Sequence, residues 1–414
     1  MLLRELFPPS VASLAHLENY VNDGSPSGYS PTQQLPPEIA PGSTSLVELP
    51  TFVVPEEKLV IVGSVDEYLT LCDKLDGLPI LLHPADNTTI PPKTWTKAPS
   101  LKAYRTASGR TFILAEDDIP PYHAKLHYPG MLGRVNRHLP FHKAVAGNEV
   151  AAELALFLVL HSGVDWAMLR EPTVVAIQGS EDRPDTESKD VCFILRSHEP
   201  YPSINAHNLA LIPSFSLFGH DAHRPQDDTL IAQILHSAGV SWRRFLDMFV
   251  IATLRYYWTM VASLGLMPEL NAQNLLFEVS RDLSVVRPVF RDMSRVEKLM
   301  HVRRRQGRTM EFVSGQYKVV DFDEDPDTAR TRHGFSFDFK LSQYIIKPIL
   351  LEVSRCTHTP FDIVLSYCRE ANLLILRELE LIRWLPERTI TWAHDRVVLT
   401  GERRYINAGP ALLR

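Results

Sequence analysis

Amide, carboxylate and guanidinium side chains gather at both ends of one short stretch of the sequence, around the apolar runs LLFEV and VVRPVF. The residues concerned are Glu269, Asn271, Gln273, Asn274, Arg291 and Asp292. Carboxylate and amide oxygens are ligands that suit Mg²⁺, and arginine suits phosphate or carboxylate. The stretch therefore predicts a site for a metal-bound anion. In the plainer interpretation, the amides cap a chain junction and the last two residues form a surface ion pair.

The elements that must position these groups are two strands. Both apolar runs are rich in Leu, Val and Phe, and the polar SRDLS separates them, which is typical of a β-hairpin. In an antiparallel pair the start of the first strand faces the end of the second. With a turn centred near Asp282, we expect Gln273 and Asn274 to lie roughly opposite Asp292. The polar groups then meet at the open end of the hairpin.

Further hydrogen-bonding groups lie at or near the ends of other expected strands. They are His83, Ser108, Arg110, Thr111, Lys125 and Arg137. A pocket for a triphosphate beside a carboxylate must balance several negative charges, and one unit pair at about 4 Å contributes about 4 kcal/mol at an effective dielectric near 20. Arginine also binds carboxylate and phosphate with two parallel hydrogen bonds. Each cation alone is compatible with a surface residue, but together they favour an anion site.

The whole chain limits the classes of protein that fit. Its 414 residues, 45% of them hydrophobic, are enough for two or three lobes. A net charge of −6 argues against a general nucleic-acid binder. The four cysteines form no C-x-x-C pair and fit a reducing cytosol. Because no apolar run approaches about 18 residues, and the first residues make a poor signal peptide, we expect a soluble cytoplasmic protein without a membrane partner.

Strand patterns are grouped early and helical patterns late, which predicts the α+β class with a strand-rich N-terminal lobe and a helix-rich C-terminal lobe around a central cleft. The expected domains are an extension with a Pro/Ser/Gly-rich linker over 1–57, a strand-rich nucleotide-binding lobe over 58–200, and a helix-rich lobe over 201–414 that contains the 268–293 hairpin. Helices are expected over 144–161, 228–263, 338–356 and 361–383.

The motifs, taken in order, resemble the siderophore synthetases that work independently of nonribosomal peptide synthetases (NIS synthetases), of the aerobactin-synthetase type. The family pattern has His-Pro, S-x-R-T, a strand Lys with an Arg twelve residues on, E-x-H-x-Q-N and a following R-D. These fall on LLHPA, SGRT, AKLHYPGMLGRVNRH, ELNAQN and VFRDM, and RRYINAGPALL is similar to the closing segment. The resemblance covers roughly residues 75–414 and implies the family's α+β fold.

The resemblance also implies a function. Such enzymes activate a carboxylate, often of citrate, as an acyl-adenylate with ATP and Mg²⁺, and an amine or hydroxyl nucleophile then displaces AMP. The implied catalytic residues are Arg137, Asn271 and Arg291. The implied ATP-binding residues are His83, Ser108, Arg110, Thr111, Lys125, Arg137, Gln273 and Asn274. The implied metal ligands are Glu269, Asn274 and Asp292.

Three departures from the family pattern keep alternatives open. Asn271 replaces the histidine of E-x-H-x-Q-N, Gly133-Arg134 replaces a Thr-Ser pair, and the N-terminal region is shorter than in most members. A non-catalytic or divergent homologue that binds a synthetase partner or a carboxylate is therefore an alternative, and a homodimer is another open possibility. A kinase-like phosphotransferase is a third, although no Gly-rich loop precedes Lys125 and no H-R-D precedes Asn274.

Overall fold

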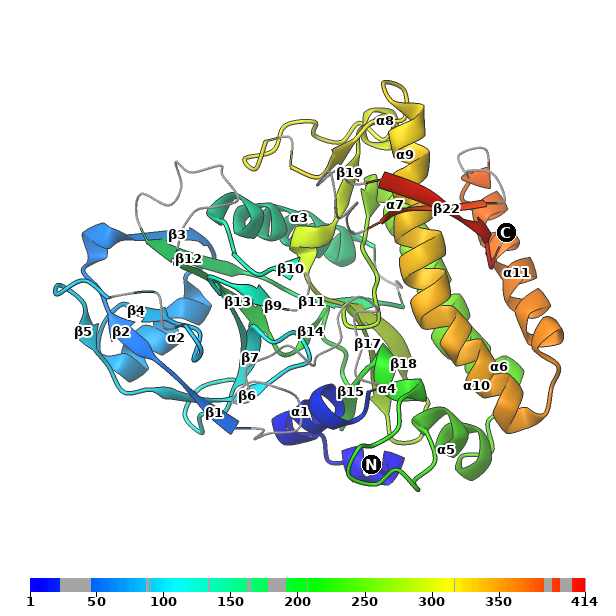
Figure 1. Cartoon of the computed structure of the whole chain (residues 1–414), viewed down its shortest axis with the longest axis horizontal. Coiled ribbons are helices and arrows are strands. Elements are labelled where there is room, and N and C mark those ends of the chain that lie inside the picture. Colours follow the sequence, from blue (N-terminus) through cyan, green and yellow to red (C-terminus); the bar gives the residue numbers. More distant parts are fainter. Residues whose placement is uncertain are drawn as a thin grey trace.

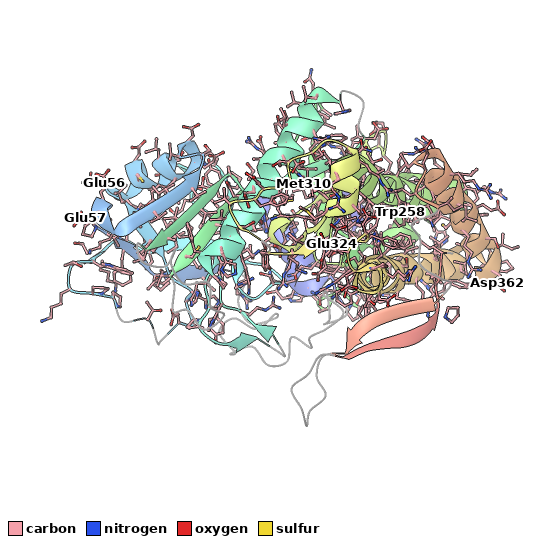
Figure 2. All side chains as sticks on the ribbon, turned by 90° about the horizontal axis from the view of Figure 1, so that it is seen from above. Glu56, Glu57, Trp258, Met310, Glu324 and Asp362 are labelled. Atoms are coloured by element: carbon pink, nitrogen blue, oxygen red, sulfur yellow. The ribbon has the colours of Figure 1, made fainter. Side chains whose placement is uncertain are left out.

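The computed structural model describes most of the chain. The described residues are 1–22, 46–86, 89, 91–132, 135–161, 165–177, 191–206, 208–315, 317–382, 389–394 and 404–413. Both strands and helices are abundant, and the expected α+β class is confirmed. The strand-rich lobe and the helix-rich lobe lie at opposite ends of the long axis of the molecule (Figure 1). In the view from above, Glu56 and Glu57 mark the strand-rich end and Trp258 lies in the helix-rich part (Figure 2).

A seven-stranded antiparallel sheet in the order β1-β6-β7-β8-β13-β12-β3 forms the strand-rich lobe. Its strands are β1 (Leu46–Leu49), β3 (Leu59–Gly63), β6 (Leu101–Arg105), β7 (Thr111–Leu114), β8 (Tyr122–Leu126), β12 (Thr173–Ile177) and β13 (Cys192–Ser197). One face packs against α2 (Asp66–Leu75), which contributes Tyr68, Leu71 and Leu75 to the buried cluster there. Other parts of the chain, including helix α3 (Phe141–Leu160), pack against the opposite face.

Strand β8 shows how the sequence directs side chains to the two faces. Tyr122, Ala124 and Leu126 belong to the apolar cluster beneath α2. Because side chains alternate along a strand, His123 and Lys125 point to the opposite face, where they are buried. The pattern YHAKL thus sends a lysine toward the centre of the molecule.

A five-stranded sheet in the order β14-β11-β18-β17-β15 lies at the centre. Its strands are β11 (Ala167–Leu169), β14 (Pro200–Tyr201), β15 (Leu209–Pro213), β17 (Leu275–Ser280) and β18 (Val286–Phe290). Strands β17 and β18 form the expected hairpin, in which Leu275 pairs with Phe290. The Arg291 backbone N–H donates to the Asn274 carbonyl at 3.0 Å, so Asn274 and Gln273 do lie opposite the residues that follow β18.

Helix α3 (Phe141–Leu160) joins the two sheets. Its first turns pack on the free face of the seven-stranded sheet through Ala144, beside Val174 and Ile194. Gly147 then brings the helix very close to the 3₁₀ turn η5 (Met293–Arg295), because a Cβ there would lie 3.0 Å from the Ser294 nitrogen and 2.8 Å from Glu171 Oε2. The segment that follows β18 is therefore held against the first lobe.

Helices build most of the second lobe and cover the face of the five-stranded sheet that carries Phe277 and Phe290 (Figure 1). They are α1 (Val11–Tyr20), α4 (Ser214–Phe218), α5 (Leu230–Ser237), α6 (Trp242–Leu246), the π-helical η4 (Asp247–Ile251), α7 (Ala252–Leu264), α8 (Met300–Arg305), α9 (Pro326–His333), the π-helical η6 (Gly334–Ile346), α10 (Lys347–Thr357) and α11 (Phe361–Glu378). Helix α1 instead places Leu14 on the opposite face, beside Ile113 of the seven-stranded sheet. The short 3₁₀ helices η1 (Leu3–Leu6) and η3 (Glu56–Lys58) complete the set within the described ranges.

Small sheets fill the remaining positions. They contain β2 (Thr51–Val53), β4 (Pro79–Leu81) and β5 (Thr96–Lys97); β9 (Met131–Leu132) and β10 (Val135–Asn136); β16 (Leu266–Met267), β19 (Glu297–Leu299) and β20 (Val319–Val320); and β21 (Thr389–His394) and β22 (Arg404–Pro410). In Figure 2 the β21–β22 hairpin lies along one side of the helix-rich lobe. None of the helices that the structure describes is both long and apolar enough to cross a membrane.

Several boundaries differ from the sequence-based expectations. Strands β1 and β2 precede residue 58 but join the sheets of the strand-rich lobe, and β11 and β14 precede residue 201 but join the central sheet. The expected helix over 228–263 is broken between α5 and α6, where Gly239 has a φ of +65° and the Ser241 side chain caps a new helix start. The expected helix over 338–356 begins earlier, after the Asp325 cap, and the linker residues 23–45 lie outside the described residues.

Candidate functional site

The site centres on an ion pair that joins the two sheets. Lys125 of β8 donates from Nζ to Asp292 Oδ1 at 2.6 Å and to Ser294 Oγ at 3.2 Å. Ser294 Oγ in turn donates to Asp292 Oδ1 at 2.7 Å. Asp292 has a left-handed backbone (φ 71°), which aspartate tolerates better than most residues. The lysine and the aspartate predicted from separate motifs therefore meet in the fold.

Arg110 reaches the same region from a tight turn between β6 and β7. Its Nη1 donates to the Arg137 and His138 carbonyl oxygens at 2.7 and 3.1 Å. Ser108 Oγ shapes the turn by accepting the Thr111 backbone N–H at 2.8 Å. Burial and the neighbouring Arg137 charge, partly opposed by Asp292, lower the pKa of Arg110 to about 9. Arg110 is thus a cation held among other cations.

His83 contacts the same turn through a hydrogen bond to its backbone. Its Nε2 lies 2.9 Å from the Gly109 carbonyl oxygen, and its Nδ1 accepts the Ala85 backbone N–H at 3.1 Å. These two bonds define the neutral tautomer with the proton on Nε2. Burial lowers the pKa of His83 to about 4. The structure therefore places His83, Ser108 and Thr111 as supports of the turn that carries Arg110.

Arg137 and Arg295 add two more guanidinium groups. Burial and the charge of Arg295, partly opposed by Asp292 and Glu269, lower the pKa of Arg137 to about 10. For Arg295 the burial effect is outweighed by the Glu269 carboxylate, the Tyr317 phenol and Asp292, so its pKa is raised. The motif-derived Arg110, Lys125 and Arg137 are therefore brought together, with Arg295 beside them.

Two carboxylates share this cationic region. Burial would raise the pKa of Asp292, but the charges of Lys125, Arg196 and Arg295 outweigh it and hold the pKa below its usual range. Burial likewise opposes ionisation of Glu269, but Lys340, whose Nζ lies 3.8 Å away, and Arg295 lower its pKa. Both carboxylates are therefore ionised at neutral pH.

The hairpin amides mainly organise the backbone. Asn271 Oδ1 accepts the Gln273 and Asn274 backbone N–H groups at 3.0 and 3.1 Å. Asn274 Nδ2 donates to the Glu269 carbonyl at 3.3 Å. Asn271, which stands where the family pattern has histidine, thus caps the turn that leads into β17. This contact uses the side-chain oxygen of Asn271.

Arg291 points away from the other predicted cations. Its Nε donates to the Gln273 carbonyl at 2.8 Å, and its Nη1 lies 2.6 Å from Glu18 Oε1 in an ion pair with helix α1. Arg291 and Glu18 are both buried. The structure therefore gives the Arg291 charge a partner inside the protein, and Arg291 is not among the charges that shift the pKa of Arg110 or Arg137.

Among the described residues, the buried donors Arg137 Nε and Gln273 Nε2 have no acceptor. Arg291 Nη1 and Nη2 also lack a hydrogen-bond acceptor, although Nη1 forms the ion pair with Glu18. Buried N–H groups are rarely left unpaired in folded proteins, so such groups call for an explanation. An oxyanion ligand would supply the missing acceptors. Within the described ranges, no group of three or more His, Cys, Asp or Glu side chains is arranged to hold a metal ion.

Sequence reasoning missed several members of the site. They are Arg295, Tyr317, Lys340, Arg196 and Glu171. Arg295 follows Asp292 by one helical turn, and that proximity was the available signal. Arg196 donates from Nη2 to Glu171 Oε1 at 2.5 Å in a buried pair beside Lys125, and nothing local in the sequence marks that contact. The predicted departures at Gly133 and Arg134 lie outside the described residues.

Comparison with known proteins finds similar proteins by structure but not by sequence. No protein-family model matches the chain, and no curated protein matches it by sequence. Solved structures do match. Aerobactin synthetase IucA from a hypervirulent pathotype of Klebsiella pneumoniae, also solved in an ATP-bound form, aligns with a TM-score of 0.68 and 13% identity over 99% of this chain and 80% of that chain.

A second match comes from another organism. The petrobactin biosynthesis protein AsbB from Bacillus anthracis str. Sterne aligns with a TM-score of 0.72 and 13% identity over 97% of this chain and 74% of that chain. Both alignments span nearly all of the present chain at very low identity, so they report the fold. The chain has the fold of the NIS siderophore synthetases.

Proposed function

We propose that this chain is an ATP-dependent synthetase that adenylates a citrate-like di- or tricarboxylic acid and condenses it with an amine or hydroxyl nucleophile, in siderophore or related biosynthesis. The observation that supports this proposal is the cluster of Arg110, Lys125, Arg137 and Arg295 around the carboxylates of Asp292 and Glu269. Two further carboxylates lie nearby, but Glu171 pairs with Arg196 and Glu297 pairs with Lys318. ATP and a polycarboxylate together present the negative charge that such a cluster needs.

The lowered pKa values of three cations support an anionic ligand. Burial lowers the pKa of Lys125, Arg110 and Arg137, which means that their charged forms are less stable in the free protein than in water. A bound phosphate or carboxylate would offset that penalty, since opposite charges at short range favour ionisation. It would also supply acceptors for Arg137 Nε and Gln273 Nε2. Both effects favour the binding of an oxyanion at this site.

A magnesium ion fits this arrangement only together with the nucleotide. Mg²⁺ commonly binds one or two carboxylates and completes its shell with water and substrate phosphates. Asp292 and Glu269 are the ionised carboxylates available, with Asn274 beside Glu269. When bound, the metal would neutralise phosphate charge. Lys125 already pairs with Asp292, which is consistent with a metal that binds only with its phosphate ligand.

The proposed reaction depends on cations held in fixed positions and uses no nucleophilic side chain of the protein. A substrate carboxylate oxygen would attack the α-phosphorus of ATP and release pyrophosphate, and the nucleophile would then attack the acyl carbon and release AMP. Both steps build negative charge on oxygen. Fixed cations in a water-poor site stabilise such charge without reorganising. Arg110, Arg137 and Arg295 are the groups positioned to do this.

A non-catalytic homologue is the second candidate, and one observation favours it. Asn271 stands where the family pattern has histidine, and its oxygen is already used by backbone N–H groups. A protein of this kind would bind ATP or a carboxylate without turnover.

The test combines binding with product analysis. Titration calorimetry with Mg-ATP should show saturable binding, and ATP–pyrophosphate exchange against a panel of di- and tricarboxylic acids should identify the acid. Mass spectrometry with added amines should then find AMP, pyrophosphate and a condensed product. ADP with a phosphorylated acid would instead favour the kinase-like alternative. Binding without exchange for any acid would favour the non-catalytic one.

Two lysine variants test whether the reaction takes place at the junction of the two sheets. Lys125→Met removes the cation at the sheet junction and should abolish exchange. Lys74→Met removes a lysine that pairs with Glu116 and Asp118 at the strand-rich end, so exchange should persist. Equal exchange in the two variants, with both folded, would place the reaction elsewhere.

A further inference from the structure

Helix α1 contributes a buried glutamate that touches both halves of the site region. Glu18 has an exposed fraction of 0%. Its Oε2 accepts the Ala107 backbone N–H at 3.0 Å, and its Oε1 lies 2.6 Å from Arg291 Nη1. One carboxylate thus bridges a turn of the seven-stranded sheet and the end of a strand of the five-stranded sheet.

Each end of this bridge is next to a ligand-facing group. Ala107 belongs to the turn that Ser108 and His83 support and that carries Arg110. Arg291 immediately precedes Asp292, and its Nε donates to the Gln273 carbonyl. A shift of Glu18 would therefore move the Arg110 turn relative to the Asp292 segment.

The rest of α1 strengthens this connection. Asn19 Nδ2 donates to the Arg105 carbonyl at 2.8 Å, directly before the same turn. The Ser10 side chain caps the start of the helix by accepting the Ser13 N–H at 3.0 Å. The helix is thus tied to the strand-rich lobe at the residue after Glu18, and the ion pair ties it to the hairpin.

We propose that Glu18 is a positioning residue for the nucleotide site: it holds the turn that carries Arg110 in register with the segment that carries Asp292. This inference rests on the proposed function, because it gives Glu18 an effect on ATP affinity and turnover. We assign Glu18 no contact with the ligand, since its Oε2 accepts the Ala107 N–H and its Oε1 lies against Arg291 in an ion pair. The alternative is that the bridge contributes only to folding stability.

Glu18→Gln tests the difference. The amide keeps the size of the side chain but has one acceptor oxygen, so it cannot satisfy both Ala107 and Arg291. We expect ATP affinity and kcat in the folded variant to fall about tenfold or more, as small misplacements of binding groups do. Hydrogen exchange of the peptide that contains Ala107 should become faster, and added Mg-ATP should protect it less than in the wild type.

Glu278→Gln is the matched control. Glu278 and Arg287 form another buried ion pair on the same hairpin, near its turn. This variant also leaves a buried arginine without its carboxylate, so its melting temperature should fall. Its ATP affinity should stay within about twofold of the wild type, as expected for a site that is not coupled to the ligand.

A second variant, with the shorter aspartate side chain, provides the test if Glu18→Gln does not fold. Glu18→Asp retains the charge for Arg291 but is too short to bridge both partners. We expect a smaller fall in melting temperature than in Glu18→Gln, because the charge for Arg291 is kept, together with clearly weaker ATP binding.

The outcomes are separable. Wild-type ATP affinity in folded Glu18→Gln or Glu18→Asp overturns the positioning role alone. An equal loss of ATP affinity in Glu278→Gln also overturns it, because the effect would then be a general loss of stability. No ATP binding by the wild type overturns the proposed function, and the inference with it.

Discussion

The two ends of the β17–β18 hairpin handle charge differently. At the turn end, Arg287 Nε donates to Glu278, and Asp282 accepts from Ser280 and Ser284. Arg287, Glu278 and Asp282 each have their partners within the hairpin or beside it. At the open end, Asp292 and Glu269 lie among more cations than they can neutralise. Within the described residues, buried donors of Arg137, Gln273 and Arg291 lack hydrogen-bond acceptors there.

The difference teaches what distinguishes a structural ion pair from a binding site. A buried pair is stable when its charges match and its hydrogen bonds are satisfied. The turn end meets that condition by itself. We infer that the open end meets it only when an anion binds, whereas the turn end needs no ligand.

Asp292→Asn should have the largest effect. It leaves Lys125 buried without its carboxylate, and removal of one partner of a buried pair costs about 3 kcal/mol of stability or more. Turnover should fall to background. Added pyrophosphate should raise the melting temperature of this variant more than that of the wild type, because an anion can replace the lost carboxylate beside Lys125. Urea unfolding and thermal melts measure both effects.

Glu278→Gln again provides the comparison, because it leaves Arg287 similarly unpaired at the turn end. Its melting temperature should not respond to pyrophosphate beyond the wild-type response. An equal rise in melting temperature with pyrophosphate in the two variants would contradict the inference that only the open end of the hairpin binds an anion.

Arg137→Ala should have the next largest effect. It removes an unpaired guanidinium donor, and loss of one charge-assisted hydrogen bond costs about 1.5–3 kcal/mol, or roughly 10- to 150-fold in kcat/KM. Arg137→Lys should recover part of the rate, because it restores charge without the planar fork. Steady-state kinetics with ATP varied gives both values.

A surface arginine controls for the loss of a guanidinium in general. Arg255 forms an exposed pair with Glu378, so Arg255→Ala should leave the rate unchanged. A wild-type rate in Arg137→Ala at both low and saturating ATP would remove Arg137 from the site.

The smallest expected effect is on the pH dependence of stability. Burial lowers the pKa of His83 from 6.5 to about 4 in the folded chain, so between these values the unfolded state binds more protons. Stability should therefore decrease as the pH falls from 6.5 toward 4, by about 1 kcal/mol per pH unit for His83 alone. At the turn end, burial raises the pKa of Glu278, which gives the opposite slope, and Asp282, with a pKa of about 2, does not respond in this range.

Urea unfolding at several pH values between 7 and 5 measures this slope. His83→Gln should reduce it, because the amide does not titrate. His358→Asn serves as the control, since His358 is exposed and asparagine tolerates its positive φ of 54°. An unchanged slope in His83→Gln would show that the Arg110 turn does not depend on a neutral histidine.

Local patterns in the sequence were enough to predict parts of the fold. Richness in Leu, Val and Phe predicted β17 and β18, and the polar SRDLS predicted their turn. The expectation that Gln273 and Asn274 lie roughly opposite Asp292 is met to within one residue, since the Arg291 N–H donates to the Asn274 carbonyl. The α+β class also followed, because strand and helix periods differ. Helix ends were less predictable. The expected end of the last helix at 383 lies outside the described residues, and α11 itself ends at Glu378.

The candidate site was predictable in membership but less so in roles. The motifs nominated Arg110, Lys125, Arg137, Glu269 and Asp292, which the fold brings together. They could not show that Asn271 caps a turn or that His83 and Ser108 support one. Those roles depend on backbone groups whose positions are set only after folding.

By itself, the sequence determined which residues alternate on each strand, because a strand repeats every two residues, and this directed Lys125 away from the α2 face. Only the tertiary structure decided that Lys125 meets Asp292, that Arg295 joins them, and that Arg291 turns to Glu18. The physical reason is that these contacts join segments far apart in the chain. They form because α3, α1 and the two sheets pack together, and no local period in the sequence encodes that packing.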